Sequence, residues 1–353
     1  MRIALVTETF YPAVDGTTTT VRAVADHLID AGHQVLVVAP GPGIASYRGS
    51  RVARVAPHTR PGPQVRAALA SFGPDLVHVT SPGTVGRKAL KHAAGLGART
   101  LVVQHSPVAT SRVDQWLHQA VARADRVVVT AEWLADDVAR LGVAADTWLP
   151  GVDTRAFAPT LRDPWLHRSW SRSGRTSEPL VVVGYVGSLH RRHGVRRLAE
   201  LAGVPGTRVV VVGDGPQREW LRSRLPRARF VGSLEAGHLA TAMASLDVLV
   251  HPGERETCCH ALREGAASGV PVVAPRSGGA RAVVRPLETG LLFEPGTDGA
   301  LADAVAALAA DRQRGLMGAH ARQVALRRTW SDAVAELVSE HYAVALGREL
   351  TAA

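Results

Sequence analysis

Two carboxylates, Glu256 and Glu264, flank a cysteine pair in the stretch ERETCCHALRE, residues 254–264. This stretch follows an apolar run that predicts a buried strand, and it leads into a predicted helix. Polar residues between the carboxyl end of a strand and the next helix are where α/β proteins bind ligands. Ionised carboxylates accept hydrogen bonds from hydroxyl groups, so one acid suits a sugar and the other a ribose diol. The alternative is that Glu264 belongs to an ordinary solvated helix.

A second polar turn follows another predicted strand, in the stretch GYVGSLHRRHG of residues 184–194. Gly187 permits a close approach of a ligand to the backbone. Ser188, Arg192 and His193 add polar and cationic groups near a helix start, which suits a pyrophosphate. A solvated basic turn would explain the same residues without a ligand.

Two more strand ends carry candidate residues. Gly16 and Thr17 open a helix in YPAVDGTTTTV, residues 11–21, where backbone N–H groups and the helix dipole favour an anion. The alternative is helix capping alone, by Asp15 or a threonine. His105 ends a strand in VVQHSP and could contact a substrate hydroxyl or a phosphate, or form a hydrogen bond beneath a loop.

No metal site is expected, because the chain contains no H-E-x-x-H, C-x-x-C or D-x-D spacing. Its two cysteines are adjacent, and neighbours in sequence rarely form a strain-free disulfide. A reduced, cytoplasmic protein is therefore expected. The start MRIALVTETF lacks the pattern of a secretory signal, and no apolar run approaches the roughly 18 residues of a membrane span.

The net charge of +10 comes almost wholly from arginine, since Lys88 and Lys91 are the only lysines of the 353 residues. This balance favours phosphate-bearing small molecules or peripheral contact with the anionic inner face of a membrane. GC-rich codon usage is an equally simple explanation. Nucleic acid is not an expected partner, because the arginines are dispersed and no zinc-finger, RNP or basic-zipper pattern occurs.

Short apolar runs alternate with helical patterns along most of the chain, which predicts parallel sheets covered on both faces. The predicted strands are 2–8, 33–40, 75–81, 99–106, 126–131, 180–188, 208–215, 228–233, 247–253, 270–275 and 290–295. The predicted helices are 17–32, 85–97, 112–124, 194–203, 217–225, 237–246, 259–269, 280–284 and a helical tail from about 298 to 349.

The length and the alternation predict two doubly wound, Rossmann-like α/β domains facing a cleft. Residues 1–157 are predicted to form the first domain, and residues 180–328 the second. Between them, 158–179 loses periodicity and is rich in Ser, Arg and Pro, so it is predicted to be a linker, with packing of its two tryptophans at a domain seam as the alternative. The tail 329–353 is expected to cross back to the first domain.

Several stretches together resemble retaining glycosyltransferases of family 4, which have the GT-B fold. The similarity runs nearly end to end, and it is greatest to bacterial GDP-mannose-dependent α-mannosyltransferases and phosphatidylinositol mannosyltransferases. It rests on ETFYPAVDGTTTTV, PDLVHVTSPGTVG, GVDTRAF, VVVVGDGPQREWL and the E-x7-E spacing from Glu256 to Glu264. These motifs are specific for fold and superfamily, and less so for sugar and acceptor.

The resemblance implies a nucleotide-sugar donor, with GDP-mannose the first expectation, and a lipid, a glycan or a small molecule as acceptor. The resemblance also implies that residues 1–157 lie on the acceptor side and that residues 180–328 bind the nucleotide sugar. In the first domain, Gly16 and Thr17 would offer N–H groups to the donor phosphates, and His105 would lie near the reacting sugar. In the second, Glu256 would hold the sugar hydroxyls beside the backbone of Thr257 and Cys258, Glu264 would bind the ribose, and Val231 and Gly232 would line the base pocket. No enzyme nucleophile is implied, so catalysis would rest on positioning and on stabilising the leaving pyrophosphate.

Several positions depart from the family pattern, including Cys258, Cys259 and Gly265, and three further departures replace basic residues. Ser188 and His193 stand where the resemblance implies an arginine and a lysine gripping the diphosphate, and Pro150 replaces another arginine. Arg191 and Arg192 are the neighbouring cations that could substitute. The leading hypothesis is a metal-independent retaining hexosyltransferase. The alternatives are a catalytically degenerate relative that binds a nucleotide sugar or a partner protein, and a relative with sugar-nucleotide epimerase chemistry.

Overall fold

The computed structural model describes residues 1–13, 15–173 and 178–347, and the chain divides into two units. Unit 1 holds Met1–Gly151 and the chain from Trp330, and unit 2 holds Val152–Thr329. The two boundaries lie beside each other in the fold, because the N–H of Val152 donates to the carbonyl of Arg328 at 3.2 Å. The boundaries between the units, after Gly151 and after Thr329, differ by a few residues from the predicted domain ends at 157 and 328.

Unit 1 contains β1 (Arg2–Thr7), β2 (Gln34–Pro40), β3 (Ser46–Tyr47), β4 (Ser50–Val55), β5 (Leu76–Thr80), β6 (Arg99–Gln104), β7 (Arg126–Val129) and β8 (Asp146–Thr147). They form one sheet in the order β3-β4-β2-β1-β5-β6-β7-β8. Every neighbouring pair is parallel except the hairpin β3-β4. The central strand β5 is buried along its whole length, as expected for a parallel sheet covered on both faces.

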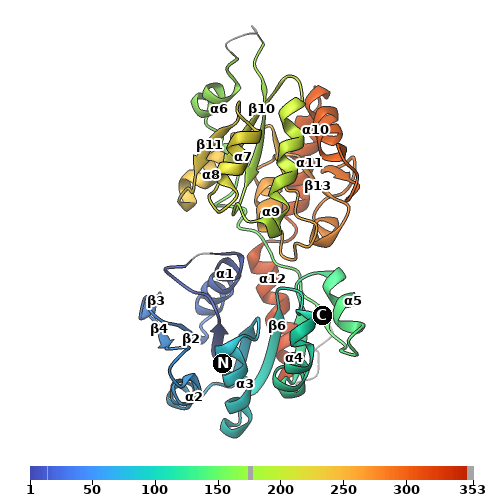
Figure 1. Ribbon diagram of the computed structural model, residues 1–353. Coiled ribbons are helices and arrows are strands. Elements are labelled where there is room, and N and C mark those ends of the chain that lie inside the picture. The colour runs from blue at the N-terminus through green and yellow to red at the C-terminus, as the bar shows by residue number, and fades with distance from the viewer. Residues whose placement is uncertain (14, 174–177, 348–353) are drawn as a thin grey trace. The chain divides into compact units, whose positions relative to one another are not determined.

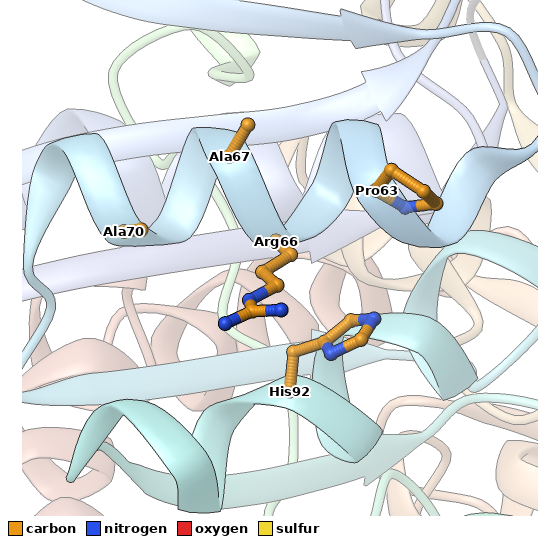
Figure 2. Close-up of a pocket in the computed structure, with 5 residues that line it drawn as sticks. All are labelled: Pro63, Arg66, Ala67, Ala70 and His92. Atoms are coloured by element: carbon orange, nitrogen blue, oxygen red, sulfur yellow. The ribbon is translucent and has the colours of Figure 1, made fainter.

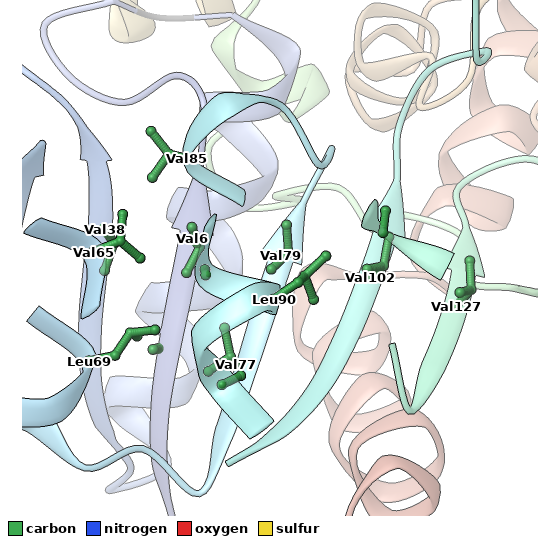
Figure 3. Close-up of a cluster of buried hydrophobic side chains, with 14 of the residues drawn as sticks. Val6, Val38, Val65, Leu69, Val77, Val79, Val85, Leu90, Val102 and Val127 are labelled. Atoms are coloured by element: carbon green, nitrogen blue, oxygen red, sulfur yellow. The ribbon is translucent and has the colours of Figure 1, made fainter. Parts of the chain in front are cut away.

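Helices pack on both faces of the unit 1 sheet (Figure 1). They are α1 (Gly16–Asp30), α2 (Pro61–Phe72), α3 (Thr84–Ala93), α4 (Val113–Gln119), α5 (Glu132–Ala139), α12 (Trp330–Glu336) and α13 (Ala343–Ala345), with a π-helix over Leu337–Tyr342. Figure 3 shows one core, in which Leu69 of α2 and Leu90 of α3 meet strand valines such as Val77. Burial of these side chains on both faces is the main source of stability for such a sheet.

The C-terminal segment packs on the other face of the unit 1 sheet, against α1. Trp330 and Tyr342 are buried there, and the Tyr342 hydroxyl lies 2.7 Å from Nδ1 of His78 on β5. The indole N–H of Trp148 donates to the carbonyl of Ala333 at 2.7 Å. Through these contacts the described residues 330–347 complete the core of unit 1. Residues 348–353 of the predicted tail lie outside the described residues.

Unit 2 contains β9 (Val181–Val186), β10 (Thr207–Val212), β11 (Arg229–Gly232), β12 (Val248–Val250), β13 (Val272–Pro275) and β14 (Gly290–Phe293). They form a parallel sheet in the order β11-β10-β9-β12-β13-β14. Its helices are α6 (Pro164–Ser171), α7 (Arg218–Arg224), α8 (Ala236–Ala244), α9 (His260–Ala267), α10 (Ala300–Ala310) and α11 (Arg314–Ala325), with 3-10 helices at Arg191–His193, Val195–Gly203 and Gly278–Ala282. Both sheets are Rossmann-like, which confirms the predicted α/β class.

The segment predicted to be a linker, 158–179, has a different structure over its described part. It forms a 3-10 turn at Pro159–Leu161 and then α6, which Asp163 caps through the N–H groups of Trp165 and Leu166. Trp170 is buried in the core of unit 2. Trp170 therefore anchors this segment on the unit 2 core, and Arg162 and His167 bind Asp247, whereas Trp165 is 77% exposed. Residues 174–177 lie outside the described residues.

Candidate active site

The carboxyl edge of the unit 2 sheet carries most of the predicted site residues. β9 is the first strand of this sheet along the chain, and β10 and β12 lie on its two sides. Open α/β sheets bind ligands where the strand order reverses in this way, outside the carboxyl ends of the strands. Gly187 and Ser188 follow β9, and His251 follows β12. The turn with His193 and the loop with Glu256 extend from these two strand ends and meet.

Glu256 lies between two histidines. Its Oε1 atom is 2.6 Å from Nδ1 of His193 and 3.5 Å from Nε2 of His251. Burial alone would raise the pKa of Glu256, but the interactions with the two histidines outweigh it and hold that pKa well below its usual range. Glu256 is therefore an ionised acceptor of hydrogen bonds and not a proton donor. This is the state that suits binding of hydroxyl groups.

The backbone around Glu256 is fixed by close packing against the 3-10 turn at Gly278–Ala282. The N–H of Gly279 donates to the carbonyl of Glu256 at 2.7 Å. A Cβ on Gly279 would stand 2.3 Å from the carbonyl oxygen of Thr257, so no other residue fits there without moving the loop. From below, the buried Arg263 donates through Nε to the carbonyl of Cys258 at 3.0 Å. The Thr257–Cys258 backbone is thus held in place before any ligand arrives.

Glu264 lies half-buried on α9, in the helix that the same loop begins. Cys259 enters that helix with a positive φ of 50° and is buried, as is Cys258. Burial raises the pKa of the Cys259 thiol, so it stays protonated and does not act as a nucleophile. The two acids therefore belong to one loop-and-helix segment, and the cysteines between them serve packing.

Gly187 follows β9 and Gly232 ends β11, and Gly213, which follows the strand β10 between them, contacts both. The N–H of Gly213 donates to the carbonyl of Gly232 at 2.8 Å, and a Cβ on Gly213 would stand 1.9 Å from the carbonyl oxygen of Gly187. Ser188 is exposed beside them, and its carbonyl accepts from the Tyr185 hydroxyl at 3.0 Å. Val231 is exposed for 37% of its surface. Val231 and Gly232 on β11 are therefore removed from Glu256 in strand order, whereas Gly187 and Ser188 follow β9, which is next to β12.

The remaining predicted residues belong to unit 1. Gly16 is exposed and Thr17 half-buried in the first turn of α1, and Asp15 caps that turn by accepting from the N–H of Thr18 at 2.8 Å. His105 is buried at the carboxyl end of β6. The helix capping by Asp15, which the sequence offered as the alternative for this turn, is thus present in the structure. Anion binding by Gly16 and Thr17, and contact of His105 with the sugar, stay predictions.

Sequence reasoning did not single out His251 or Glu8. The His251 ring is buried and stacks on Tyr185 with centroids 6.0 Å apart, and its position at a strand end is the same signal that identified His105. Glu8 follows β1 next to β5, where the strand order of unit 1 reverses, and its Oε1 atom accepts from the N–H of Gly86 at 2.8 Å. The signal in the sequence that could have identified Glu8 is its position as an acidic residue at the end of the first apolar run.

A hollow of about 360 Å³ lies on unit 1 between α2 and α3. Figure 2 shows Arg66 of α2 and His92 of α3 pointing toward one another across it. Burial lowers the pKa of His92, and the charges of Lys91, Arg66 and Lys88 lower it further, so four basic groups gather here. Over the residues the structure describes, no cluster of three or more metal-ligating side chains occurs.

Comparison with known proteins identifies the chain. Residues 14–156 match the family model described as Glycosyltransferase Family 4, and residues 181–311 match Glycosyl transferases group 1. The chain is 40% identical to a GDP-mannose-dependent alpha-mannosyltransferase of Mycolicibacterium smegmatis, over 99% of this chain and 98% of that protein. It belongs to glycosyltransferase family 4. A protein of the same name from Mycobacterium tuberculosis is 36% identical over 100% of this chain and 99% of that protein.

Solved structures place this family 4 glycosyltransferase in the GT-B fold. A sucrose-phosphate synthase from Thermosynechococcus elongatus superimposes with a TM-score of 0.81 over 97% of this chain and 98% of that one, at 22% identity. A likeness at this identity concerns the fold alone. Among the described residues, none of the helices is long and apolar enough to cross a membrane.

Proposed function

We propose that this glycosyltransferase moves a mannosyl group from GDP-mannose to an acceptor hydroxyl, with retention at the anomeric carbon and without a metal ion. The observation that carries the proposal is the ionised Glu256 at the switch point of the unit 2 sheet, fixed by His193 and His251. A carboxylate kept charged in this place can accept hydrogen bonds from two sugar hydroxyls. The full-length similarity to proteins named for GDP-mannose supports this donor.

The other site residues take roles that fit their places in the two units. In unit 2, Glu264 accepts from the ribose, the Thr257–Cys258 backbone lies beside the sugar, Gly187 and Ser188 lie at the diphosphate, and Val231 and Gly232 flank the base. In unit 1, Gly16 and Thr17 offer N–H groups to the phosphates, and His105 lies near the reacting carbon. These are the roles that the family resemblance implies, and the places of the residues at strand ends and helix starts, where α/β proteins hold phosphates and sugars, support them.

Catalysis in this scheme rests on positioning and on charge at the leaving diphosphate. A retaining transfer in which the leaving group departs on the face that the acceptor attacks needs no enzyme nucleophile, and the buried thiols of unit 2 offer none. Preorganised donors at the developing charge contribute most of the rate enhancement in such sites. Ser188 is a neutral hydrogen-bond donor near the diphosphate, so the positive charge that stabilises the leaving diphosphate comes from the exposed Arg191 and Arg192.

The decisive experiment offers purified protein GDP-mannose, GDP-glucose, UDP-glucose and UDP-N-acetylglucosamine. We expect GDP-mannose to give the largest rise in unfolding temperature, since a ligand of the folded state stabilises it by mass action. Donor hydrolysis and transfer are followed by release of GDP, with and without EDTA, and the product anomer by NMR. A preference for another donor, an inverted product or loss of activity in EDTA would each contradict one part of the proposal. Binding without turnover would favour the degenerate alternative.

The acceptor is tested in the same assay by supplying a lipid-linked acceptor, a mannoside and an aminocyclitol in parallel. We propose an acceptor hydroxyl without choosing its carrier, because a carboxylate such as Glu8 and an imidazole such as His105 can form hydrogen bonds with hydroxyl groups of any of the three. Transfer to one class and not to the others assigns the carrier.

We also propose peripheral contact with an anionic membrane through the surface between α2 and α3. Both lysines of the chain lie there with Arg66 and His92, and each cation near such a surface contributes about 1 kcal/mol. The double variant K88E/K91E should reduce sedimentation with phosphatidylglycerol-containing vesicles about tenfold or more. R312E/R327E, which reverses two exposed arginines of unit 2, is the charge-matched control. Equal loss in both variants, or binding to pure phosphatidylcholine vesicles, would contradict the proposal.

A further inference from the structure

Three side chains of unit 2 form a continuous hydrogen-bonded chain that no sequence motif indicated. Nε of Arg192 lies 3.1 Å from Nε2 of His193, and Nδ1 of His193 lies 2.6 Å from Oε1 of Glu256. The imidazole thus stands between a guanidinium and a carboxylate. His193 and Glu256 are each about four-fifths buried, while Arg192 is exposed.

The donor and acceptor roles in this chain are set by chemistry. A guanidinium N–H can only donate, so Nε2 of His193 accepts and carries no hydrogen. The hydrogen of the neutral ring is therefore on Nδ1, from which it is donated to the Glu256 carboxylate. Arg192 in this way fixes the tautomer of His193, and the N–H that this tautomer carries on Nδ1 fixes the orientation of the Glu256 carboxylate. A lysine at position 193 would place a flexible point charge there in place of a directed donor.

Backbone packing holds the imidazole in this place. His193 ends the 3-10 turn Arg191–His193, and Gly194 follows with a φ of +66°. A Cβ on Gly194 would stand 2.5 Å from the carbonyl oxygen of Pro252, in the loop that leads from β12 to Glu256. The turn after β9 and the loop after β12 therefore pack backbone to backbone, and the His193–Glu256 contact has little room to vary.

Arg192 has capacity left for a ligand. It uses Nε on His193, and within the described ranges its two Nη nitrogens make no hydrogen bond to the protein. A planar guanidinium with free, exposed Nη groups is suited to a phosphate oxygen. The same residue can therefore contact a diphosphate and hold the histidine that orients Glu256.

We infer that His193 is a positioning residue that orients Glu256 toward the hydroxyls of the donor sugar, and that Arg192 binds the donor diphosphate while fixing the tautomer of His193. The inference rests on the proposed function, because it assumes a nucleotide-sugar donor at this edge. Together the two residues replace the arginine and lysine that the family pattern has at Ser188 and His193. Binding of the diphosphate by Arg192 and orientation of Glu256 toward the sugar are then linked through the imidazole of His193.

The test compares binding of GDP and of GDP-mannose by calorimetry, because GDP lacks the sugar that Glu256 contacts. H193N keeps a donor where Nδ1 stands, whereas H193Q moves the amide to the place of Nε2. We expect H193N to bind both ligands within about threefold of the wild type, and H193Q to lose about tenfold in affinity for GDP-mannose alone. R192Q should lose about tenfold for both ligands, since its contact is with the diphosphate.

H190Q is the matched control, because His190 precedes the same turn, is exposed and makes no side-chain hydrogen bond that caps this turn. It should leave both affinities unchanged. Equal behaviour of H193N and H193Q, or a loss for GDP in H193Q as large as that for GDP-mannose, would overturn the positioning role. An R192Q variant that binds GDP like the wild type would overturn the role of Arg192.

The outcome also separates this inference from the function on which it rests. A wild type that binds another nucleotide sugar in place of GDP-mannose overturns only the donor assignment, and the same variants are then compared with that donor and its nucleotide. A wild type that binds no nucleotide sugar overturns both. Unfolding temperatures measured alongside identify a variant that fails to fold, and R192Q, whose side chain is exposed, keeps the inference testable in that case.

Discussion

Asp247 and Glu256 lie at opposite ends of β12, and both are largely but not fully buried carboxylates that contact a histidine. Asp247 precedes the strand and accepts from His167 Nε2 at 2.9 Å, from an Nη of Arg162 at 2.9 Å and from the N–H of Val182 at 2.8 Å. Glu256 follows the strand and meets His193 at 2.6 Å. Burial alone would raise the pKa of Asp247, yet its hydrogen bonds lower that pKa to about 2. The pKa of Glu256 is lowered by the same balance of effects.

The two acids differ in what surrounds them. Asp247 accepts from a charged guanidinium, an imidazole and a backbone N–H, so its lone pairs are used within the protein. It joins the segment with Arg162 and His167 to the amino end of β12. Glu256 is oriented by imidazoles at the carboxyl end, where α/β proteins bind ligands. A buried, ionised carboxylate is therefore no sign of function by itself, and the end of the strand at which it lies tells the two roles apart.

Replacing Glu256 with glutamine is expected to have the largest effect. E256Q keeps the shape of the side chain but loses the charge that accepts from sugar hydroxyls, so kcat should fall by about 100-fold or more. D247N is the matched control, because it makes the same chemical change at the other end of the strand, and its kcat should stay within about twofold. Turnover of GDP-mannose by E256Q at the wild-type rate would remove Glu256 from the site.

A stability effect is also expected at Asp247, with D247N costing about 2 kcal/mol of unfolding free energy at neutral pH. The folded-state pKa of about 2 lies below the ordinary 3.8, so this contribution is complete above pH 3.8 and is lost as the pH falls toward 2. Urea unfolding of wild type and D247N at pH 7 and at pH 3 measures it. A difference that does not shrink at the lower pH would mean that the ion pairs are not its source.

A third carboxylate, Asp15, gives the smallest expected effect, because its contacts are local. It caps α1 through the N–H of Thr18, and a lost N-cap costs about 1 kcal/mol. D15A should therefore lower the unfolding free energy by about that amount, and D15N, which keeps a capping oxygen, should restore most of it. A loss of donor affinity in D15A but not in D15N would indicate that the capped turn, with Gly16 and Thr17, binds the phosphates.

Much of the fold follows from patterns that depend on near neighbours in the chain. Each predicted apolar run overlaps a strand, because a parallel strand buried on both faces is apolar along its length. The hairpin β3-β4 and helix α2 were not predicted, since α2 begins with Pro61, Gly62 and Pro63, which look like a loop. A proline at the first helical position is nevertheless compatible with a helix. The predicted helix at 194–203 forms as a 3-10 helix.

The site divides in the same way. Residue types at strand ends marked Glu256, His193 and His105, because a polar residue after an apolar run is visible in the sequence alone. The same reasoning took Arg162 and His167 for parts of a linker, and they are partners of Asp247. Their importance depends on a contact about 80 positions away, for which a local pattern holds no signal.

Local chemistry therefore established the class of fold, the family and the residues at the strand ends. Which side chains contact Asp247 and Glu256 was decided by the order of the strands in the sheet. His193 reaches Glu256, 63 positions away, because β9 and β12 lie side by side although two strands separate them along the chain. The substitution of a lysine by His193 looks like a lost charge in the sequence. In the folded unit it is a directed hydrogen bond, because adjacency of strands, and not distance along the chain, decides which side chains meet.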